Sequence, residues 1–380
     1  MKIVFLTGCT EPGQDGLGDY TMILARECIL AGHSVTIVAL HDSFVETVVS
    51  ENRDMQIKVL RVPSDYSFAK KTPVVQALIQ DFSPDWLSFQ FVGYSFHSRG
   101  IPIGLISFLK KISGKYSLQI MLHELWIGSK RSDNLKNKII GFLQRKYVLQ
   151  MLAVLRPQVI HTSMRTNQSA LEHHGYQAKI LSIFSNIPIA TNPEMTWLYQ
   201  AVQNETDIDI RDEKRKDFII FGIFGSIYSD WNAEDFFFWL KKYFYDKKIL
   251  LISAGKLAGA GEILWENLKK KHPSIHFIKL GKRSEEEIST FLQWIDFGVA
   301  TTPAPFIPKS GTFAAMIEHG LQVIATNQDF DLPEYLDLCI PTDKQLYVIS
   351  EEKNFVENNK MSPKSRNEQI VQQFLVDLSV

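Results

Sequence analysis

Short apolar runs alternate with amphipathic stretches along most of the chain. In the first half the runs are KIVFLT, HSVTIVAL, MQIKVLRV, DWLSFQFV, SLQIMLH and PQVIHTS. They are continuous rather than alternating, which is typical of strands in a parallel sheet that is covered on both faces. Helical patterns such as PVVQALIQDF and IGLISFLKKI lie between them. The pattern predicts an α/β fold with a doubly wound, Rossmann-like domain over residues 1–188.

The pattern breaks after the first half and then resumes. Residues 189–217 are polar, charged and poor in periodic apolar positions, so we expect a linker there. A second series includes FIIFGIFG, KILLISAG, IHFIKLG, DFGVATT and LQVIAT, and it predicts a second Rossmann-like domain over 218–360. An amphipathic C-terminal helix is expected within 361–380, and no pattern assigns it to either domain. Two such domains should face a cleft at the carboxyl ends of their strands, where open α/β sheets bind ligands.

Length and charge narrow the class of protein. A chain of 380 residues is long enough for two domains. Lysine and arginine number 41 against 42 acidic residues, a net charge of -1, so bulk electrostatics favours neither nucleic acid nor a membrane surface as a partner. The three cysteines match no metal or redox spacing, which predicts a reduced, cytoplasmic protein without a metal site. The apolar start MKIVFLTGC is too short for a transmembrane segment and reads as a buried strand.

The loop GCTEPGQDGLGDY joins the first strand to the first helix. Gly16, Gly18 and Asp19 stand where glycine permits a close backbone approach and where the helix begins with its positive end. The pattern is not GxGxxG, and we expect no acidic residue to close the second strand, so a nicotinamide cofactor is not predicted. Two interpretations stay open: a phosphate-approaching loop, or an ordinary connection in which Asp19 is the helix N-cap.

A polar pair follows the middle strand of the first half. In MLHELWIG, His123 and Glu124 come directly after an apolar run, at the carboxyl end of a predicted parallel strand. A histidine there can donate a hydrogen bond to a sugar hydroxyl or a phosphate, and a carboxylate can accept a proton or a hydroxyl hydrogen bond. These two residues are our catalytic candidates, and a histidine that merely caps the strand is the alternative.

Three loops of the second half end strands in the same way. Gly225 and Ser226 lie in GSIYSDW, Lys256 in SAGKLAGAG, and Gly281 and Arg283 in LGKRSEEE. Each loop should border the ligand-binding edge of its sheet. Lys256 is either a phosphate contact or a solvated lysine, and the charges of the last loop either approach a nucleobase or simply begin a helix.

The stretch PKSGTFAAMIEHG carries a denser signal. Lys309, Ser310, Gly311 and Thr312 lead directly into an apolar helix. Unpaired amides and the helix dipole would point at one place, beside two hydroxyls and a full positive charge. An N-cap explains the hydroxyl residues alone but requires neither the glycine nor the lysine. We expect this loop to hold an anion, namely a diphosphate.

With both halves in view, the chain resembles the GT-B glycosyltransferases, and within them the retaining glycosyltransferase family 4. The resemblance lies in GLGDYTMILARECILAGHSVTIVAL, LHE, SNIP and DFGVATTPAPFIPKSGTFAAMIEHGLQVIAT. It implies that the first domain receives an acceptor and the second binds a nucleotide-sugar. It also implies a diphosphate at Lys309 to Thr312, approached from the other side by Gly16 to Asp19, and a donor sugar in contact with His123. No metal and no cofactor beyond the donor substrate is implied.

The chain also departs from that family. Its usual pair of glutamates falls at Ile307 and Ala315, and the usual basic residues after the first strand of the second domain are missing. Glu318 lies about one helical turn beyond Ala315, within reach of the ribose position. Taken as a whole, the resemblance implies transfer of a sugar to the hydroxyl of a small-molecule, glycan or lipid-linked acceptor. A noncatalytic nucleotide-sugar-binding or partner-binding relative and a nucleotide-sugar epimerase are the alternatives.

Overall fold

The structure is a computed structural model of the chain. It describes all residues except 207, 209, 258, 327–329, 351–353, 358, 359 and 380, and it does not describe the side chains of 212–214. The chain forms two compact units. The first unit comprises 1–182, 330–338 and 367–380, and the second comprises 183–329 and 339–366.

Within the described residues, the first unit contains an eight-stranded sheet in the order β3-β4-β2-β1-β5-β6-β7-β8. All its neighbours pair in parallel except β3 and β4, which are antiparallel at one edge. The strands are β1 (Lys2–Thr7), β2 (Ser34–Asp42), β3 (Val49–Arg53), β4 (Ile57–Pro63), β5 (Trp86–Phe91), β6 (Ser117–Leu122), β7 (Val159–Thr162) and β8 (Lys179–Ile180).

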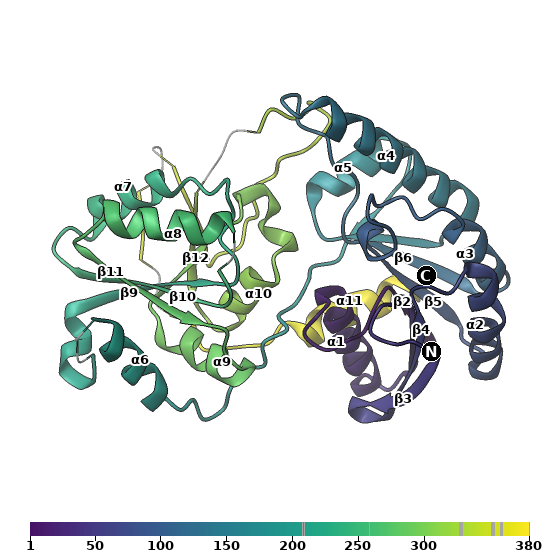
Figure 1. Cartoon of the computed structure of the whole chain (residues 1–380), viewed down its shortest axis with the longest axis horizontal. Helices are drawn as coiled ribbons and strands as arrows, with labels where there is room; N and C mark the ends of the chain where they lie inside the picture. Colours follow the sequence, from purple (N-terminus) through teal and green to yellow (C-terminus); the bar gives the residue numbers. More distant parts are fainter. Residues whose placement is uncertain are drawn as a thin grey trace. The chain divides into compact units, whose positions relative to one another are not determined.

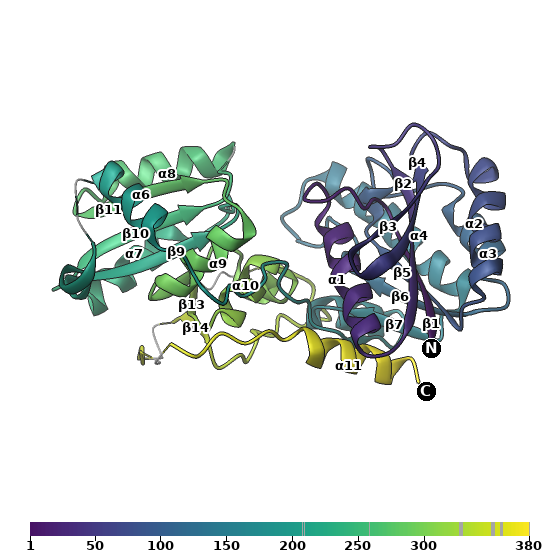
Figure 2. The same cartoon turned by 90° about the horizontal axis from the view of Figure 1, so that it is seen from below.

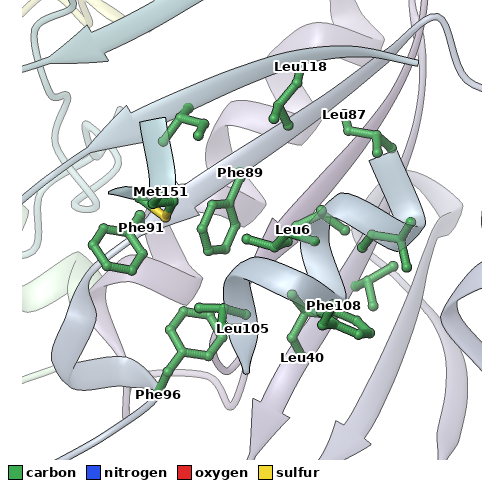
Figure 3. Close-up of a cluster of buried hydrophobic side chains, with 14 of the residues drawn as sticks. Leu6, Leu40, Leu87, Phe89, Phe91, Phe96, Leu105, Phe108, Leu118 and Met151 are labelled. Atoms are coloured by element: carbon green, nitrogen blue, oxygen red, sulfur yellow. The ribbon is translucent and has the colours of Figure 1, made fainter. Parts of the chain in front are cut away.

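Helices cover both faces of this sheet (Figures 1 and 2). The helices are α1 (Gly16–Leu30), α2 (Phe68–Phe82), α3 (Leu105–Ser113), α4 (Leu135–Leu155), α5 (Arg165–His173) and α11 (Asn367–Asp377), with short 3-10 turns at Asp54–Gln56 and Gly93–Ser95. Under α2, α3 and α4 lies one apolar core, which includes Phe89 and Phe91 of β5 and Leu105 and Phe108 of α3 (Figure 3). On the other face α1 packs beside α11, and the ring of Phe374 lies 6.0 Å from that of Phe5.

The second unit has a six-stranded parallel sheet, counted over its described residues, in the order β11-β10-β9-β12-β13-β14. Its strands are β9 (Phe218–Phe224), β10 (Lys248–Ala254), β11 (Ile275–Gly281), β12 (Phe297–Ala300), β13 (Gln322–Thr326) and β14 (Leu346–Ile349). Its helices are α6 (Thr196–Thr206), α7 (Ala233–Tyr243), α8 (Ala260–Lys271), α9 (Glu285–Trp294) and α10 (Gly311–Glu318), with 3-10 turns at Asp212–Asp217 and Ala304–Lys309. One core packs α6, α9 and α10 and another packs α7 and α8 against the sheet.

The division into units differs from the one expected from the sequence. The stretch 189–217, expected as a linker, contains α6, and Leu198 and Val202 of that helix are fully buried in the core of the second unit. Two apolar residues spaced four apart suffice to seat a helix, although the segment is polar on average. The C-terminal helix belongs to the first unit, together with residues 330–338.

Helix starts follow from local capping. The side chain of Asp15, not that of Asp19, caps α1 by accepting from the amide of Leu17, which corrects the N-cap alternative for Asp19. Ser284 and Glu287 form a capping box at the start of α9. Ser310 caps α10, which ends before Gly320 at φ 82. Across the described residues, no helix is long and apolar enough to span a membrane.

Candidate functional site

The first unit has a pocket of about 490 Å³ at the carboxyl ends of its central strands. The chain runs from β1 toward β2 in one direction and from β5 toward β6 in the other, so β1 and β5 flank the topological switch point of the sheet. The pocket wall includes residues that follow β1, β4 and β5 and others at the end of β2. These residues are Cys9, Asp15, His41, Ser43, Phe44, Ser64, Val92, Tyr94, Ser95, Phe96, His97 and Ser98.

In the glycine-rich loop before α1, Gly18 is closely packed and Gly16 borders open space. A Cβ on Gly18 would lie 2.5 Å from the carbonyl oxygen of Cys9, so this glycine is required for the close approach of α1 to the first loop. A Cβ on Gly16 would meet no atom within 4 Å. Asp19 accepts from the amide of Gly13 at 3.2 Å and so closes the loop. Gly16 is therefore the residue of this group whose backbone lies in open space.

The sequence reasoning was wrong about the end of the second strand. β2 does end in an acidic residue, Asp42, which is fully buried. Arg61 on β4 donates to it from Nε at 2.7 Å and from a terminal nitrogen at 3.1 Å. Burial alone would raise the pKa of Asp42, but the bonds from Arg61 outweigh it and hold the pKa below its usual range. This carboxylate is committed to an internal ion pair.

His123 lies just beyond β6 in a largely enclosed environment. Its Nε2 is 3.0 Å from Oε1 of Gln90 on β5, and its ring stands edge-on to Tyr20 of α1 at 4.9 Å between ring centres. Burial lowers the pKa of the imidazole to about 3, so the ring is neutral at neutral pH. Glu124, the next residue, is exposed. Gln90 and Tyr20 were not anticipated, since a glutamine inside an apolar run and a tyrosine in a helix carry no recognisable spacing.

The second unit has its own switch point, between β9 and β12. Gly225 follows β9 with φ 87, and a Cβ there would lie 2.7 Å from the side-chain methyl of Thr312. The hydroxyl of Thr301, beyond β12, donates to the carbonyl of Ser226 at 3.2 Å and accepts from the amide of Tyr228 at 3.3 Å. The structure thus brings Gly225 next to the start of α10 and Ser226 next to Thr301. Thr301 was missed because a threonine pair after a strand is a common sequence.

The start of α10 has the features expected of an anion site. Ser310 caps the helix by accepting from the amide of Phe313, and its hydroxyl lies 2.9 Å from that of Thr312. Gly311 is the first helical residue, and a Cβ on it would meet no atom within 4 Å. Helix geometry leaves the amides of Gly311 and Thr312 without a partner inside the helix. Lys309, just before the cap, is exposed.

Backbone hydrogen bonds join the ends of β9, β10 and β11 to one another. The amide of Gly225 donates to Ala254 and that of Gly255 donates to Gly281, both at 2.8 Å. Gly255 and Gly281 have φ of 112 and 70, so all three strand ends turn through glycine conformations. The side chain of Lys256 is exposed.

Arg283 makes its contacts with other residues of the second unit. Its guanidinium stacks over Trp197 of α6 at 4.9 Å, and its Nε donates to the carbonyl of Leu280 at 2.9 Å. A contact with Glu287 at 3.4 Å completes its surroundings. Arg283 therefore fastens α6 to the sheet, while its contact with a donor stays a prediction.

Glu318 is at the far end of α10 from the cap. Its side chain is buried and accepts from the amide of Ser185 in the SNIP segment at 3.0 Å. Burial raises the pKa of this carboxyl despite the hydrogen bonds it receives. Ile307 and Ala315, where the resembled family has glutamates, are fully buried apolar residues. The carboxylate of Glu318 is thus already engaged inside the unit, and its approach to a ribose stays untested.

A search for metal ligands gives no group of three or more histidine, cysteine, aspartate or glutamate side chains that could hold an ion, within the part of the chain that the structure describes. The groups that we expect to meet an anion at the start of α10 are amides, hydroxyls and a lysine.

Comparison with family models and with curated protein sequences gives no match. Solved structures, in contrast, match over most of the chain. HepE from Anabaena in complex with UDP aligns with a TM-score of 0.53 and 13% identity, over 99% of this chain and 90% of that one. The catalytic domain of starch synthase IV from Arabidopsis thaliana, bound to ADP and acarbose, aligns with a TM-score of 0.52 and 11% identity, over 86% and 83%.

UDP-GlcNAc 2-epimerase from Methanocaldococcus jannaschii is also similar, with a TM-score of 0.52 and 11% identity over 99% of this chain and 100% of that one. At such identities the likeness shows the fold alone. The chain therefore has the GT-B fold, with two Rossmann-like domains, as predicted from its sequence.

Proposed function

We propose that the protein is a glycosyltransferase that moves a sugar from a nucleotide-diphosphate sugar to an acceptor hydroxyl, with retention of configuration and without a metal ion. The observation that carries this proposal is the cluster in the second unit. There, two hydroxyls and the open first turn of α10 lie against Gly225, at a switch point of a parallel sheet.

The chemistry of that cluster suits a departing diphosphate. In the transition state of sugar transfer, negative charge develops on the leaving group, and amides fixed at a helix start stabilise it without reorganisation. Lys309 would add a full charge, and Ser310 and Thr312 would donate hydroxyl hydrogen bonds. Gly225 keeps this region narrow, since any larger residue would collide with Thr312.

The pocket of the first unit suits a polyhydroxylated acceptor. Tyr94 and Phe44 supply exposed aromatic surface, and His41, His97 and Asp15 supply polar atoms. Apolar ring faces combined with hydrogen-bonding groups are what sugar rings require. A glycan, or another acceptor with several hydroxyls, is therefore the substrate class that we assign to this pocket.

His123 would contact the donor sugar through a neutral ring. A pKa near 3 removes it as a proton carrier at neutral pH, so its contribution is a hydrogen bond that orients the sugar. Glu124 is exposed beside it and remains the candidate for proton exchange with the acceptor.

An epimerase is the second candidate function. It is favoured by the structural similarity to UDP-GlcNAc 2-epimerase, which is as extensive as the similarity to HepE and to starch synthase IV. Epimerisation at a carbon next to a carbonyl or an anomeric centre requires acid and base groups, whereas the cluster at the start of α10 offers amides, two hydroxyls and one lysine. Glycosyl transfer is therefore preferred.

The test is an incubation of the purified chain with a panel of UDP-, ADP- and GDP-sugars, followed by chromatography of nucleotides and sugars. Transfer predicts slow release of nucleoside diphosphate, accelerated by oligosaccharide acceptors. Conversion of the donor into its epimer without release would favour the second candidate. Binding of a nucleotide-sugar with neither reaction would identify a noncatalytic binding protein.

A further inference from the structure

A row of buried polar side chains runs across one face of the first unit's sheet. It starts at Asp377, the last residue of α11, whose Oδ1 accepts from Lys179 at 2.7 Å. The other carboxylate oxygen lies 2.9 Å from Nε2 of His161 on β7. On the opposite side of that ring, Nδ1 lies 3.1 Å from Nε2 of Gln119 on β6.

The row continues to the candidate sugar-binding histidine. Oε1 of Gln119 accepts from the hydroxyl of Ser88 on β5 at 2.6 Å, and Ser88 accepts from Nε2 of Gln90 at 2.8 Å. Oε1 of Gln90 lies 3.0 Å from Nε2 of His123. Ser88, Gln90, Gln119 and His161 are each at most 1% exposed, so these bonds are made without water.

Chemistry at the Asp377 end fixes the direction of the first bonds. An ionised carboxylate only accepts hydrogen bonds, so His161 must carry its proton on Nε2. Burial lowers the pKa of His161 despite the neighbouring carboxylate, which keeps the ring neutral and leaves Nδ1 as an acceptor. Burial would raise the pKa of Asp377, but Lys179 and His161 outweigh that effect and keep it ionised.

The same logic propagates along the row. Because Nδ1 of His161 accepts, Gln119 must present its NH2 group to it and its oxygen to Ser88. The hydroxyl of Ser88 then donates to Gln119 and accepts from Gln90, which leaves the oxygen of Gln90 facing His123. His123 must therefore donate from Nε2, and its Nδ1 is left as the acceptor of the ring.

We propose that Asp377 is a positioning residue that sets the tautomer of His123 through this chain of hydrogen bonds. The proton sits on Nε2, and Nδ1 is available to accept a hydrogen bond from a sugar hydroxyl. The sequence-based expectation of a histidine that donates to the sugar is thereby replaced by one that accepts. The consequence for turnover rests on the proposed function, whereas the tautomer itself does not.

One substitution should reverse the whole row. In Asp377→Asn the amide oxygen is held by Lys179, so its NH2 group faces His161. Nε2 of His161 then accepts, its proton moves to Nδ1, and both glutamine amides turn over. The NH2 group of Gln90 would face His123, whose proton would move to Nδ1. Every member stays paired, so the variant retains its hydrogen bonds.

The first measurement uses the unaltered full-length protein. With histidine labelled with 15N, two-dimensional 15N–1H correlation spectra at neutral pH report which ring nitrogen carries the proton, with assignment by His123→Gln and His161→Gln. We expect Nε2–H for both. His319 is an internal reference of the opposite kind, because its Nδ1 lies 2.7 Å from the carbonyl of Ala315 and must donate to it. An Nδ1–H form of His123 in the unaltered protein would overturn the proposal.

The second measurement uses variants. Asp377→Asn should convert both rings to Nδ1–H, and Lys179→Met alone should leave Nε2–H in place because the carboxylate still only accepts. Combining the two changes frees the asparagine to present its oxygen to His161 and should restore Nε2–H. If His123 keeps its proton on Nε2 in Asp377→Asn, the proposed chain of hydrogen bonds is refuted. If that variant does not fold, the tautomer of His123 in the unaltered protein and in Lys179→Met still tests the proposal.

Activity then separates this inference from the proposed function. If His123 accepts from the donor sugar, Asp377→Asn should lower kcat roughly fivefold to tenfold with little change in KM for the donor, as expected for one hydrogen bond. A change in the tautomer of His123 without any change in turnover would support the chain of hydrogen bonds and remove His123 from the proposed function. Loss of turnover with an unchanged tautomer of His123 would overturn the chain of hydrogen bonds but not the proposed function.

Discussion

Lys309 is the residue that most directly tests the proposed diphosphate site. If the first turn of α10 holds an anion, Lys309→Ala removes a charge-assisted contact and should weaken binding of nucleoside diphosphates by about 1.5 to 3 kcal/mol. The melting temperature should scarcely change, because Lys309 is exposed. Isothermal titration calorimetry measures the affinity, and Lys269→Ala on α8 is the control for loss of one exposed positive charge.

Ser310→Ala should change stability, whereas Lys309→Ala should change affinity. It removes the N-cap of α10 and should lower the free energy of unfolding by about 1 kcal/mol. Undiminished diphosphate affinity in Lys309→Ala, with the unaltered protein binding well, would reduce this loop to a capped helix start.

Gly16 and Gly18 lie two positions apart but should respond differently to alanine. A methyl group on Gly18 would press on the backbone of Cys9 and Thr10, and such overpacking costs about 1 to 3 kcal/mol. The same methyl on Gly16 would enter open space, so Gly16→Ala should be as stable as the original chain. Chemical denaturation of the two variants compares the costs. Equal destabilisation would mean that the loop differs from the geometry described.

At the residue scale, the sequence predicted the local geometry of a helix start but did not predict which distant residues a side chain contacts. Ser310 and Thr312 were predicted beside one another at a helix start, and their hydroxyls do lie 2.9 Å apart. The contacts of Glu318 with Ser185 and of Arg283 with Trp197 were not predicted, and their roles toward a ligand stay predictions. Those partners are 133 and 86 positions away, and no local pattern announces them.

Among the elements, α6 shows how average polarity conceals a packed helix. The segment expected as a linker is seated by Leu198 and Val202, both fully buried. Strands with continuous apolar runs were easier to predict, because every residue of a covered parallel strand contributes to the signal. A helix with two anchoring residues contributes far less, and its neighbours in the sequence mask it.

The depth of this anchoring can be measured. Leu198→Ala should lower the free energy of unfolding by about 2 to 5 kcal/mol, the usual cost of truncating a buried leucine. Gln203→Ala, on the exposed side of the same helix, should have almost no effect. Urea denaturation monitored by tryptophan fluorescence compares the two. A free linker would tolerate both changes equally.

At the scale of the whole molecule, the C-terminal segment that contains α11 belongs to the first unit. The sequence predicted two α/β halves, and that is what the structure contains, but a C-terminal amphipathic helix has no pattern that names its destination. The partners of α11 are α1 and the face of the sheet that carries Phe5 and His161. Residues at the two ends of the chain therefore share one core, and damage at one end should appear at the other.

Phe374→Ala tests this dependence. Phe374 is fully buried, with its ring 6.0 Å from those of Phe5 and His161, so its removal should cost about 3 to 5 kcal/mol. Because the units have separate cores, the loss should be local: hydrogen exchange followed by mass spectrometry should accelerate in β1 and β7 and remain unchanged in β9 and β10. Leu198→Ala is the matched control, with the opposite pattern. Faster exchange confined to α11 itself would mean that this helix rests on the first unit without supporting it.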